Sequence, residues 1–68
     1  HMPEVTVHLA AGRTPEQKKN LMKSISEAVV NTIGVSIDAV TVQIVEAPLT
    51  DKMKGGQTFV ERAAAQNK

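Results

Sequence analysis

The sequence contains no cysteine, tryptophan or tyrosine, and Phe59 is its single aromatic residue. Without cysteine, neither a disulfide nor a thiolate metal site can form. One ring gives unpaired bases no row of aromatic surfaces to stack on, and a net charge of +1 attracts phosphates only weakly. These features argue against a nucleic-acid partner. The two histidines, His1 and His8, do not cluster with acidic residues in a ligand-like spacing, so we expect no metal and no other cofactor.

The chain is also short, and its apolar runs are short. Its 68 residues fit one domain, and a chain of this size buries only about 60% of the surface that it exposes when unfolded. Because disulfides and metals are excluded, oligomerisation is the stabiliser that remains. No apolar run approaches the roughly twenty residues of a membrane span, and no signal-peptide core is found at the start. We therefore expect a cytoplasmic protein without a membrane partner.

The hydrophobic pattern predicts a strand, a helix and a second strand. Residues 4–9 alternate between apolar and polar side chains, as in a half-buried strand. Residues 14–17, Thr-Pro-Glu-Gln, form a helix-capping sequence, and apolar residues then recur every three or four positions until Gly34 ends the helix. Residues 40–46 alternate again and are rich in β-branched side chains. The fold class is therefore α/β, with a right-handed βαβ unit and two parallel strands.

The pattern after the second strand is less regular. Residues 49–54 are expected to form a polar loop, and the glycine pair 55–56 a turn that could reverse the chain into a short final strand. Residues 57–65 are ambiguous, because their first side chains favour an extended chain whereas the three alanines favour a helix. The sequence thus predicts a C-terminal turn or hairpin, and it leaves open whether the residues after the turn form a strand or a helix.

One helix can cover only one face of a two-stranded sheet, so the other face and both edges stay open. The open face carries Thr6, His8, Gln43 and Val45. We expect a second copy of the chain to stack on this face, and we interpret His8 as a packing residue of that interface rather than as a catalytic group.

The first three residues bear most directly on chemistry. His1 and Met2 precede Pro3 as a common cloning site would leave them, and the natural chain is expected to begin Met-Pro. Removal of that methionine would expose Pro3 as a secondary amine, and because amino termini ordinarily titrate at about 7.7 to 8.0, Pro3 could act as a general base. The alternative is that Pro3 merely begins an edge strand. We divide the chain into a cloning remnant (residues 1–2), a single βαβ domain (residues 3–65) and a frayed tail (residues 66–68).

With these features in this order, the chain resembles the 4-oxalocrotonate tautomerase family, and the resemblance runs nearly end to end. It is carried by residues 3–7 (Pro-Glu-Val-Thr-Val), 12–18 (Gly-Arg-Thr-Pro-Glu-Gln-Lys), 40–46 (Val-Thr-Val-Gln-Ile-Val-Glu) and 55–56 (Gly-Gly). The resemblance implies a keto–enol tautomerase in which the amine of Pro3 takes a proton and returns it at a conjugated position. It also implies that Arg13 binds a substrate carboxylate and that βαβ dimers assemble into a homohexamer.

Geometry adds a constraint that does not depend on the resemblance. Pro3 and Arg13 lie at opposite ends of the first predicted strand, which puts them about 25 to 30 Å apart in an extended chain. If both act on one small substrate, Arg13 must come from a neighbouring copy. Parallel pairing, in contrast, brings residues 40–42 beside Pro3 in the same chain, so Thr41 is predicted to line the pocket.

Two positions depart from the family pattern. Thr41 stands where active members usually carry a second arginine, so one hydroxyl replaces a charged bidentate donor. Lys52 stands where an aromatic residue is usual, and it is either a solvated loop charge or a substitute partner for the substrate's anion that could also lower the pKa of the Pro3 amine. Arg13 could instead be a solvated loop charge or pair with Glu16, and Arg62 is expected at the surface.

Three functions remain open. The first is a tautomerase acting on a small unsaturated 2-oxo or 2-hydroxy acid, with Pro3 as the base and Arg13 of a neighbour as the carboxylate ligand. The second is a hydratase, dehalogenase or decarboxylase on the same scaffold, and the third is a noncatalytic assembly subunit. Because Met2 makes the nitrogen of Pro3 an amide, the chain that begins at His1 is expected to be inactive.

Overall fold

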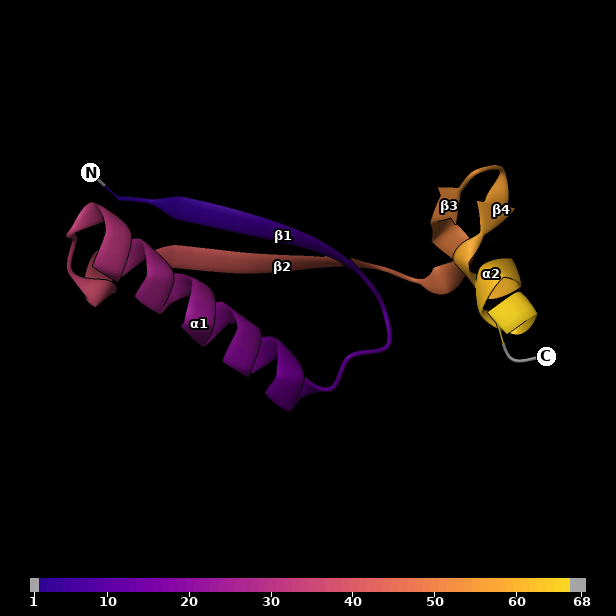
Figure 1. The fold of residues 1–68 in the computed structure, drawn as a ribbon, viewed down its shortest axis with the longest axis horizontal. Helices are drawn as coiled ribbons and strands as arrows, with labels where there is room; N and C mark the ends of the chain where they lie inside the picture. The colour runs from indigo at the N-terminus through magenta and orange to yellow at the C-terminus, as the bar shows by residue number, and fades with distance from the viewer. Residues whose placement is uncertain (1, 67–68) are drawn as a thin grey trace.

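A parallel two-stranded sheet and one covering helix form the larger part of the structure, a computed structural model that describes residues 2–66 (Figure 1). The strands are β1 (Glu4–Ala10) and β2 (Thr41–Ala47), and α1 (Pro15–Ile33) connects them. All seven residues of β1 pair in parallel with the seven of β2. This arrangement confirms the predicted βαβ unit, although each strand ends one residue later than the alternation predicts.

Both ends of α1 lie where the sequence predicts them. The Thr14 hydroxyl accepts a hydrogen bond from the Gln17 backbone N–H at 3.1 Å, and the Gln17 side-chain oxygen accepts one from the Thr14 backbone N–H at 3.0 Å. At the other end Gly34 adopts φ +83°, and its N–H donates to the Val30 carbonyl at 3.0 Å. A capping box and a left-handed glycine thus bound the crossover helix. Across residues 2–66, neither α1 nor any other helix combines the length and apolar character needed to cross a membrane.

The helix covers one face of the sheet and leaves the other open. The half-buried side chains of the covered face are Val5, Val7, Leu9, Val42 and Ile44. The opposite face is exposed as predicted, and it carries Thr6, His8, Gln43 and Val45. No side chain of residues 2–66 is fully buried. The covered face is therefore only half of a hydrophobic core.

The remaining residues form a second, smaller body, which we call the C-terminal arm (residues 48–66). It consists of the 3₁₀ turn η2 (Leu49–Asp51), the strands β3 (Met53–Lys54) and β4 (Gln57–Thr58) and the helix α2 (Phe59–Gln66). β3 and β4 pair antiparallel across the two glycines, which both have positive φ, so the predicted hairpin is confirmed. The expected loop at 49–54 is more ordered than predicted, because it contains η2 and β3.

The arm packs mainly on itself. The chief packing partners of α2 are η2 and β4, and Figure 1 shows the arm standing away from the layer formed by α1, β1 and β2. Gln66, which the sequence assigned to a frayed tail, is the last residue of α2, while residues 67 and 68 lie outside the described residues.

A second capping box explains why the ambiguous residues 57–65 turn into a helix after Thr58. The Thr58 N–H donates to Glu61 Oε1 at 2.8 Å, and the Glu61 N–H donates to the Thr58 hydroxyl at 3.1 Å. The Thr58 hydroxyl also lies 3.0 Å from the same Glu61 oxygen. These reciprocal bonds satisfy free N–H groups at the helix start, and this favours the helical conformation over further extension.

The same bonds make the start of α2 sensitive to pH. Hydrogen bonds from the backbone N–H of Thr58, and next from its hydroxyl, lower the pKa of Glu61 below the ordinary 4.5. A carboxylate with a lowered pKa stabilises the folded form above its unfolded pKa, and this contribution is lost as the pH falls through the folded value. We expect the NMR chemical shifts of α2 to lose helical character as the pH falls below about 4.5. Glu61→Gln, which keeps an acceptor for Thr58, should remove that titration; an identical acid titration in both proteins would contradict the assignment.

The whole chain is extended for its size. Its principal extents are 46 × 22 × 16 Å, and its radius of gyration is 15.5 Å, whereas a compact domain of this length has a radius of gyration of about 11 Å. Its accessible surface is 5279 Å², compared with about 4,200 Å² for a compact monomer of the same mass. A single copy therefore leaves exposed the surfaces that the sequence assigns to neighbouring copies.

Candidate active site

Pro3 lies at the amino end of β1, beside the start of β2. The backbone N–H of Thr41 donates to the Pro3 carbonyl at 3.0 Å, which confirms that the two residues are neighbours in one chain. Pro3 is half-buried and Thr41 is exposed. The 3₁₀ turn η1 (Ile37–Ala39) comes just before β2, and its Ile37 side chain is 51% exposed. This end of the sheet thus offers a nitrogen atom, a hydroxyl and an accessible apolar side chain.

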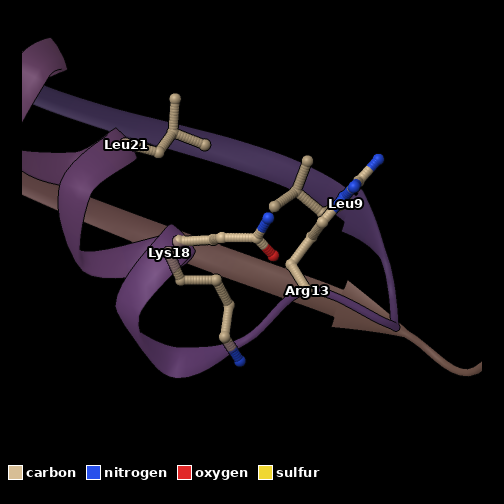
Figure 2. Close-up of a pocket in the computed structure, with 5 residues that line it drawn as sticks. Leu9, Arg13, Lys18 and Leu21 are labelled. Carbon is tan, nitrogen blue, oxygen red and sulfur yellow. The ribbon is translucent and has the colours of Figure 1, made fainter.

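Arg13 lies beyond the carboxyl end of β1, in the short connection to α1. The Ala11 N–H continues the pairing by donating to the Ala47 carbonyl at 2.9 Å, and the chain then leaves the sheet. Arg13 lies near Leu9 in a shallow pocket of about 200 Å³, which is also lined by Gln17, Lys18 and Leu21 (Figure 2). Within residues 2–66 Arg13 forms no salt bridge, so the alternative pairing with Glu16 is not formed.

The length of β1 separates these two groups. The strand spans roughly 20 Å between its first and last Cα atoms, at about 3.3 Å per residue. In Figure 1 the amino end and the connection between β1 and α1 lie at opposite ends of the sheet. A small acid cannot touch Pro3 and Arg13 of one copy at the same time. A site that uses both residues needs at least two copies of the chain.

Lys52 lies in the C-terminal arm, between η2 and β3. Its Nζ lies 5.7 Å from the centroid of the Phe59 ring, and its carbonyl accepts the Phe59 N–H at 2.9 Å. Lys52 is therefore held against the ring rather than fully solvated, by a contact that contributes about 0.5 to 1 kcal/mol at an exposed site. Thr41 marks the opposite end of β2, so Lys52 can approach only the Pro3 of another copy.

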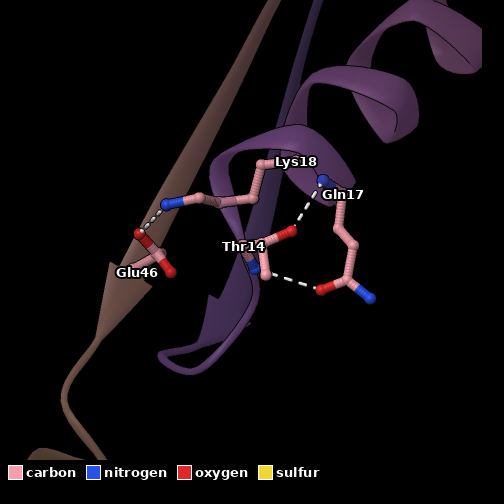
Figure 3. Close-up of polar contacts among 4 residues, drawn as sticks. All are labelled: Thr14, Gln17, Lys18 and Glu46. Atoms are coloured by element: carbon pink, nitrogen blue, oxygen red, sulfur yellow. Dashed lines mark hydrogen bonds and ion pairs between the residues drawn. The ribbon is translucent and has the colours of Figure 1, made fainter.

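Two other basic residues near these elements, Lys18 and Arg62, have partners. Lys18 Nζ lies 2.7 Å from Glu46 Oε1, and this ion pair joins α1 to β2 beside the Arg13 pocket (Figure 3). Arg62 is half-buried, and its Nη1 donates to the Lys54 carbonyl at 3.4 Å. Arg62 thus braces the hairpin while its side chain stays partly exposed at the surface. Residues 2–66 contain no group of three or more histidine, aspartate and glutamate side chains that could hold a metal ion.

Gln17 is a pocket residue that the sequence analysis assigned only to capping. The Thr-x-x-Gln pattern predicts that the side-chain oxygen of Gln17 accepts a hydrogen bond at the helix start, but it does not predict what the NH₂ group of the amide contacts. The structure places Gln17 in the wall of the pocket that contains Arg13. The same residue therefore contributes to the helix start and to the candidate binding surface.

Comparisons with known proteins all point to one family. The model of the family described as Tautomerase enzyme matches residues 3–62. Probable tautomerase bsl7456 of Bradyrhizobium diazoefficiens is 61% identical over 67 residues, which cover 98% of this chain and 100% of that protein.

Solved structures show the same similarity. A chain from a study of 4-oxalocrotonate tautomerase isozymes of Methylibium petroleiphilum superposes with a TM-score of 0.85 at 41% identity, covering 93% of this chain and 98% of that chain. A chain from a heterohexamer 4-oxalocrotonate tautomerase of Chloroflexus aurantiacus J-10-fl has a TM-score of 0.82 at 30% identity, with coverages of 88% and 97%.

Proposed function

The chain belongs to the tautomerase family, and we propose that it is an isomerase that moves a proton within a small unsaturated 2-oxo or 2-hydroxy acid. The nitrogen of Pro3 takes the proton of the enol hydroxyl, and the electron pair of that O–H bond becomes part of a carbonyl group. The displaced C=C electrons take the proton back from Pro3 at a conjugated carbon. Substrate and product are isomers, so the reaction needs no cofactor.

The observation that carries this proposal is the position of Pro3. It directly precedes β1, lies against the start of β2, and is also the residue at which the family match begins. As a chain terminus, Pro3 would present a secondary amine with a basic lone pair. A positioned general base of this kind accelerates proton transfer by about a hundredfold to ten-thousandfold.

We assign the binding of the substrate carboxylate to Arg13 of a neighbouring copy. Support comes from the pocket, where Arg13 forms no salt bridge within residues 2–66 and lies beside two leucines that can contact a carbon skeleton. The extended shape of the chain supports assembly, and one structural relative is named a heterohexamer. We propose a homo-oligomer, with a hexamer as the favoured form.

Thr41 and Lys52 complete the proposed site. Thr41 lies next to Pro3 along the sheet, and its hydroxyl can donate one hydrogen bond to the substrate oxygen. Lys52, held against Phe59 in the arm of another copy, would add a positive charge. The pair supplies the same unit charge as the usual second arginine but lacks its planar fork of donors, so the substrate carboxylate binds chiefly through Arg13.

One observation favours a second function, a noncatalytic subunit of a mixed assembly. Thr41 carries no charge where the resembled family usually has an arginine, and the Chloroflexus relative is described as a heterohexamer. A partner chain with the missing arginine would then complete the site. A hydratase, dehalogenase or decarboxylase on the same scaffold is the further alternative that the loss of this arginine suggests.

The proposed function predicts measurable turnover by the protein with a free Pro3 terminus. We expect it to convert phenylenolpyruvate and 2-hydroxymuconate to their keto isomers faster than the uncatalysed reaction in buffer. The conversion is measured by the change in ultraviolet absorbance. Bovine serum albumin at equal mass controls for nonspecific protein catalysis. If an assembled preparation of confirmed terminus converts neither acid, the tautomerase proposal is wrong and the assembly-subunit alternative is favoured.

A further inference from the structure

We propose that Gln17 binds the substrate carboxylate together with Arg13, through the NH₂ group of its side-chain amide. The inference rests on the proposed function, because it concerns the acid that Arg13 is proposed to bind. It adds a neutral donor of fixed orientation to that site, and it derives from the hydrogen bonds of Gln17 at the start of α1 (Figure 3).

The orientation of the Gln17 amide follows from the bond that its oxygen accepts. Oε1 lies 3.0 Å from the backbone nitrogen of Thr14, and a backbone N–H can only donate. The amide must therefore present its oxygen to Thr14, which removes the usual ambiguity between the oxygen and nitrogen positions. Figure 3 shows the nitrogen on the side away from Thr14. Within residues 2–66 no acceptor is bonded to this NH₂ group, so its two donors are available to a ligand.

The pocket around Gln17 contains one uncompensated positive charge. Arg13 lines it without a salt bridge or side-chain hydrogen bond to residues 2–66, whereas Lys18 is neutralised by its ion pair with Glu46 at 2.7 Å. The other lining residues, Leu9 and Leu21, are apolar. A pocket of about 200 Å³ is smaller than the roughly 300 to 1,000 Å³ of a typical ligand site, so it suits one end of an acid.

The capping bond also makes Gln17 an efficient donor. Its side chain is already held by Thr14 before a ligand arrives, so less side-chain freedom is lost on binding. A hydrogen bond to a carboxylate is shorter and stronger than one between neutral groups. Arg13 can contribute parallel N–H donors while Gln17 reaches a remaining lone pair, which selects a single planar carboxylate group.

Gln17→Glu tests this role while preserving the cap. Glutamate keeps an oxygen for the Thr14 N–H and is a normal capping-box residue, but it replaces the NH₂ donor with a negatively charged oxygen. In the protein with a free Pro3 terminus we expect the KM for phenylenolpyruvate to rise at least roughly tenfold, because a charged hydrogen bond is lost and the new carboxylate repels that of the substrate. We expect kcat to change little and the melting temperature to stay within about 2 °C of wild type.

Two controls separate binding from stability. Thr14→Ala removes the hydroxyl of the same capping box but keeps the backbone N–H that orients Gln17, so it should lower the melting temperature by several degrees and leave KM unchanged. The methyl ester of phenylenolpyruvate lacks the carboxylate charge, so wild type and Gln17→Glu should handle it equally. A KM effect of Gln17→Glu that is equally large for the ester would overturn the proposal.

A binding measurement distinguishes failure of this inference from failure of the proposed function. Benzoate, an unreactive carboxylate, is titrated into both proteins and followed by NMR shifts of residues 13–21. We expect Gln17→Glu to weaken the dissociation constant roughly tenfold, whether or not the wild type is catalytically active. Equal benzoate binding by both proteins, or no binding by the wild type, overturns the inference. Turnover of phenylenolpyruvate with the same KM in both overturns it while leaving the tautomerase proposal intact.

Discussion

A chain that begins at Pro3 is expected to isomerise phenylenolpyruvate about a hundredfold to ten-thousandfold faster than the chain that begins at His1. In the longer chain Met2 acylates the nitrogen of Pro3, and an amide nitrogen has no basic lone pair to accept the enol proton. Met2 is 79% exposed, so its removal deletes little packing. The difference in rate therefore reports the chemistry of the nitrogen atom rather than the stability of the fold.

The comparison needs terminus and assembly to be controlled. Mass spectrometry establishes that each preparation has a single first residue, because a trace of processed chain could account for weak activity in the longer one. Sedimentation and circular dichroism check that both chains assemble and fold alike. Chemical acetylation of the Pro3 terminus should return the shorter chain to the activity of the longer one. Equal rates from the free and blocked termini would remove Pro3 from the mechanism.

Local signals in the sequence were sufficient to predict most of the βαβ unit. The limits of α1 are set by hydrogen bonds between residues only three or four positions apart, so a local pattern is enough to predict them. These bonds involve the capping residues Thr14 and Gln17 at the start and the glycine Gly34 at the end. Alternation sets the faces of both strands, and parallel register then brings Thr41 to Pro3. The separation of Pro3 and Arg13 follows from the same strand.

The C-terminal arm was harder to predict, because its signals compete or act through space. The Thr-x-x-Glu pattern of Thr58 and Glu61 is visible in the sequence, yet the neighbouring β-branched and aromatic residues favour extension equally well. The contact of Lys52 with Phe59 depends on how the hairpin folds back, and no periodicity encodes it.

The candidate site divides in the same way. Sequence geometry predicts which residues cannot meet in one copy, but the free donor of Gln17 becomes visible only when the acceptor of its oxygen is known. The neutralisation of Lys18 by Glu46, 28 positions later, is likewise a tertiary contact. One chain thus contains both Pro3 and Arg13 of the proposed site. Bringing the two residues together depends on the interfaces between copies of the chain.

Arg13→Ala is expected to lower kcat/KM for phenylenolpyruvate by roughly tenfold to 150-fold, corresponding to about 1.5 to 3 kcal/mol for a lost charged hydrogen bond. The loss should fall mainly on KM, because the carboxylate is bound in the substrate and in the transition state alike. Arg13→Lys is the matched variant: it keeps the charge but loses the fork of donors, so an intermediate effect is expected. An unchanged KM in Arg13→Ala would exclude the carboxylate role.

Mixing variants tests whether Arg13 acts on the Pro3 of another copy. One chain carries Arg13→Ala with a free Pro3, and the other carries intact Arg13 behind a blocked terminus, so neither alone contains a complete site. After denaturation and refolding together in equal amounts, about a quarter of the sites in randomly mixed oligomers should combine a free Pro3 with an intact Arg13. Activity should then exceed the sum of the two separately refolded proteins. If native mass spectrometry shows mixed oligomers but activity stays at that sum, the site does not cross between copies. Because β1 lies between Pro3 and Arg13 and by itself spans roughly 20 Å within one chain, such a result would also separate Arg13 from the chemistry of Pro3.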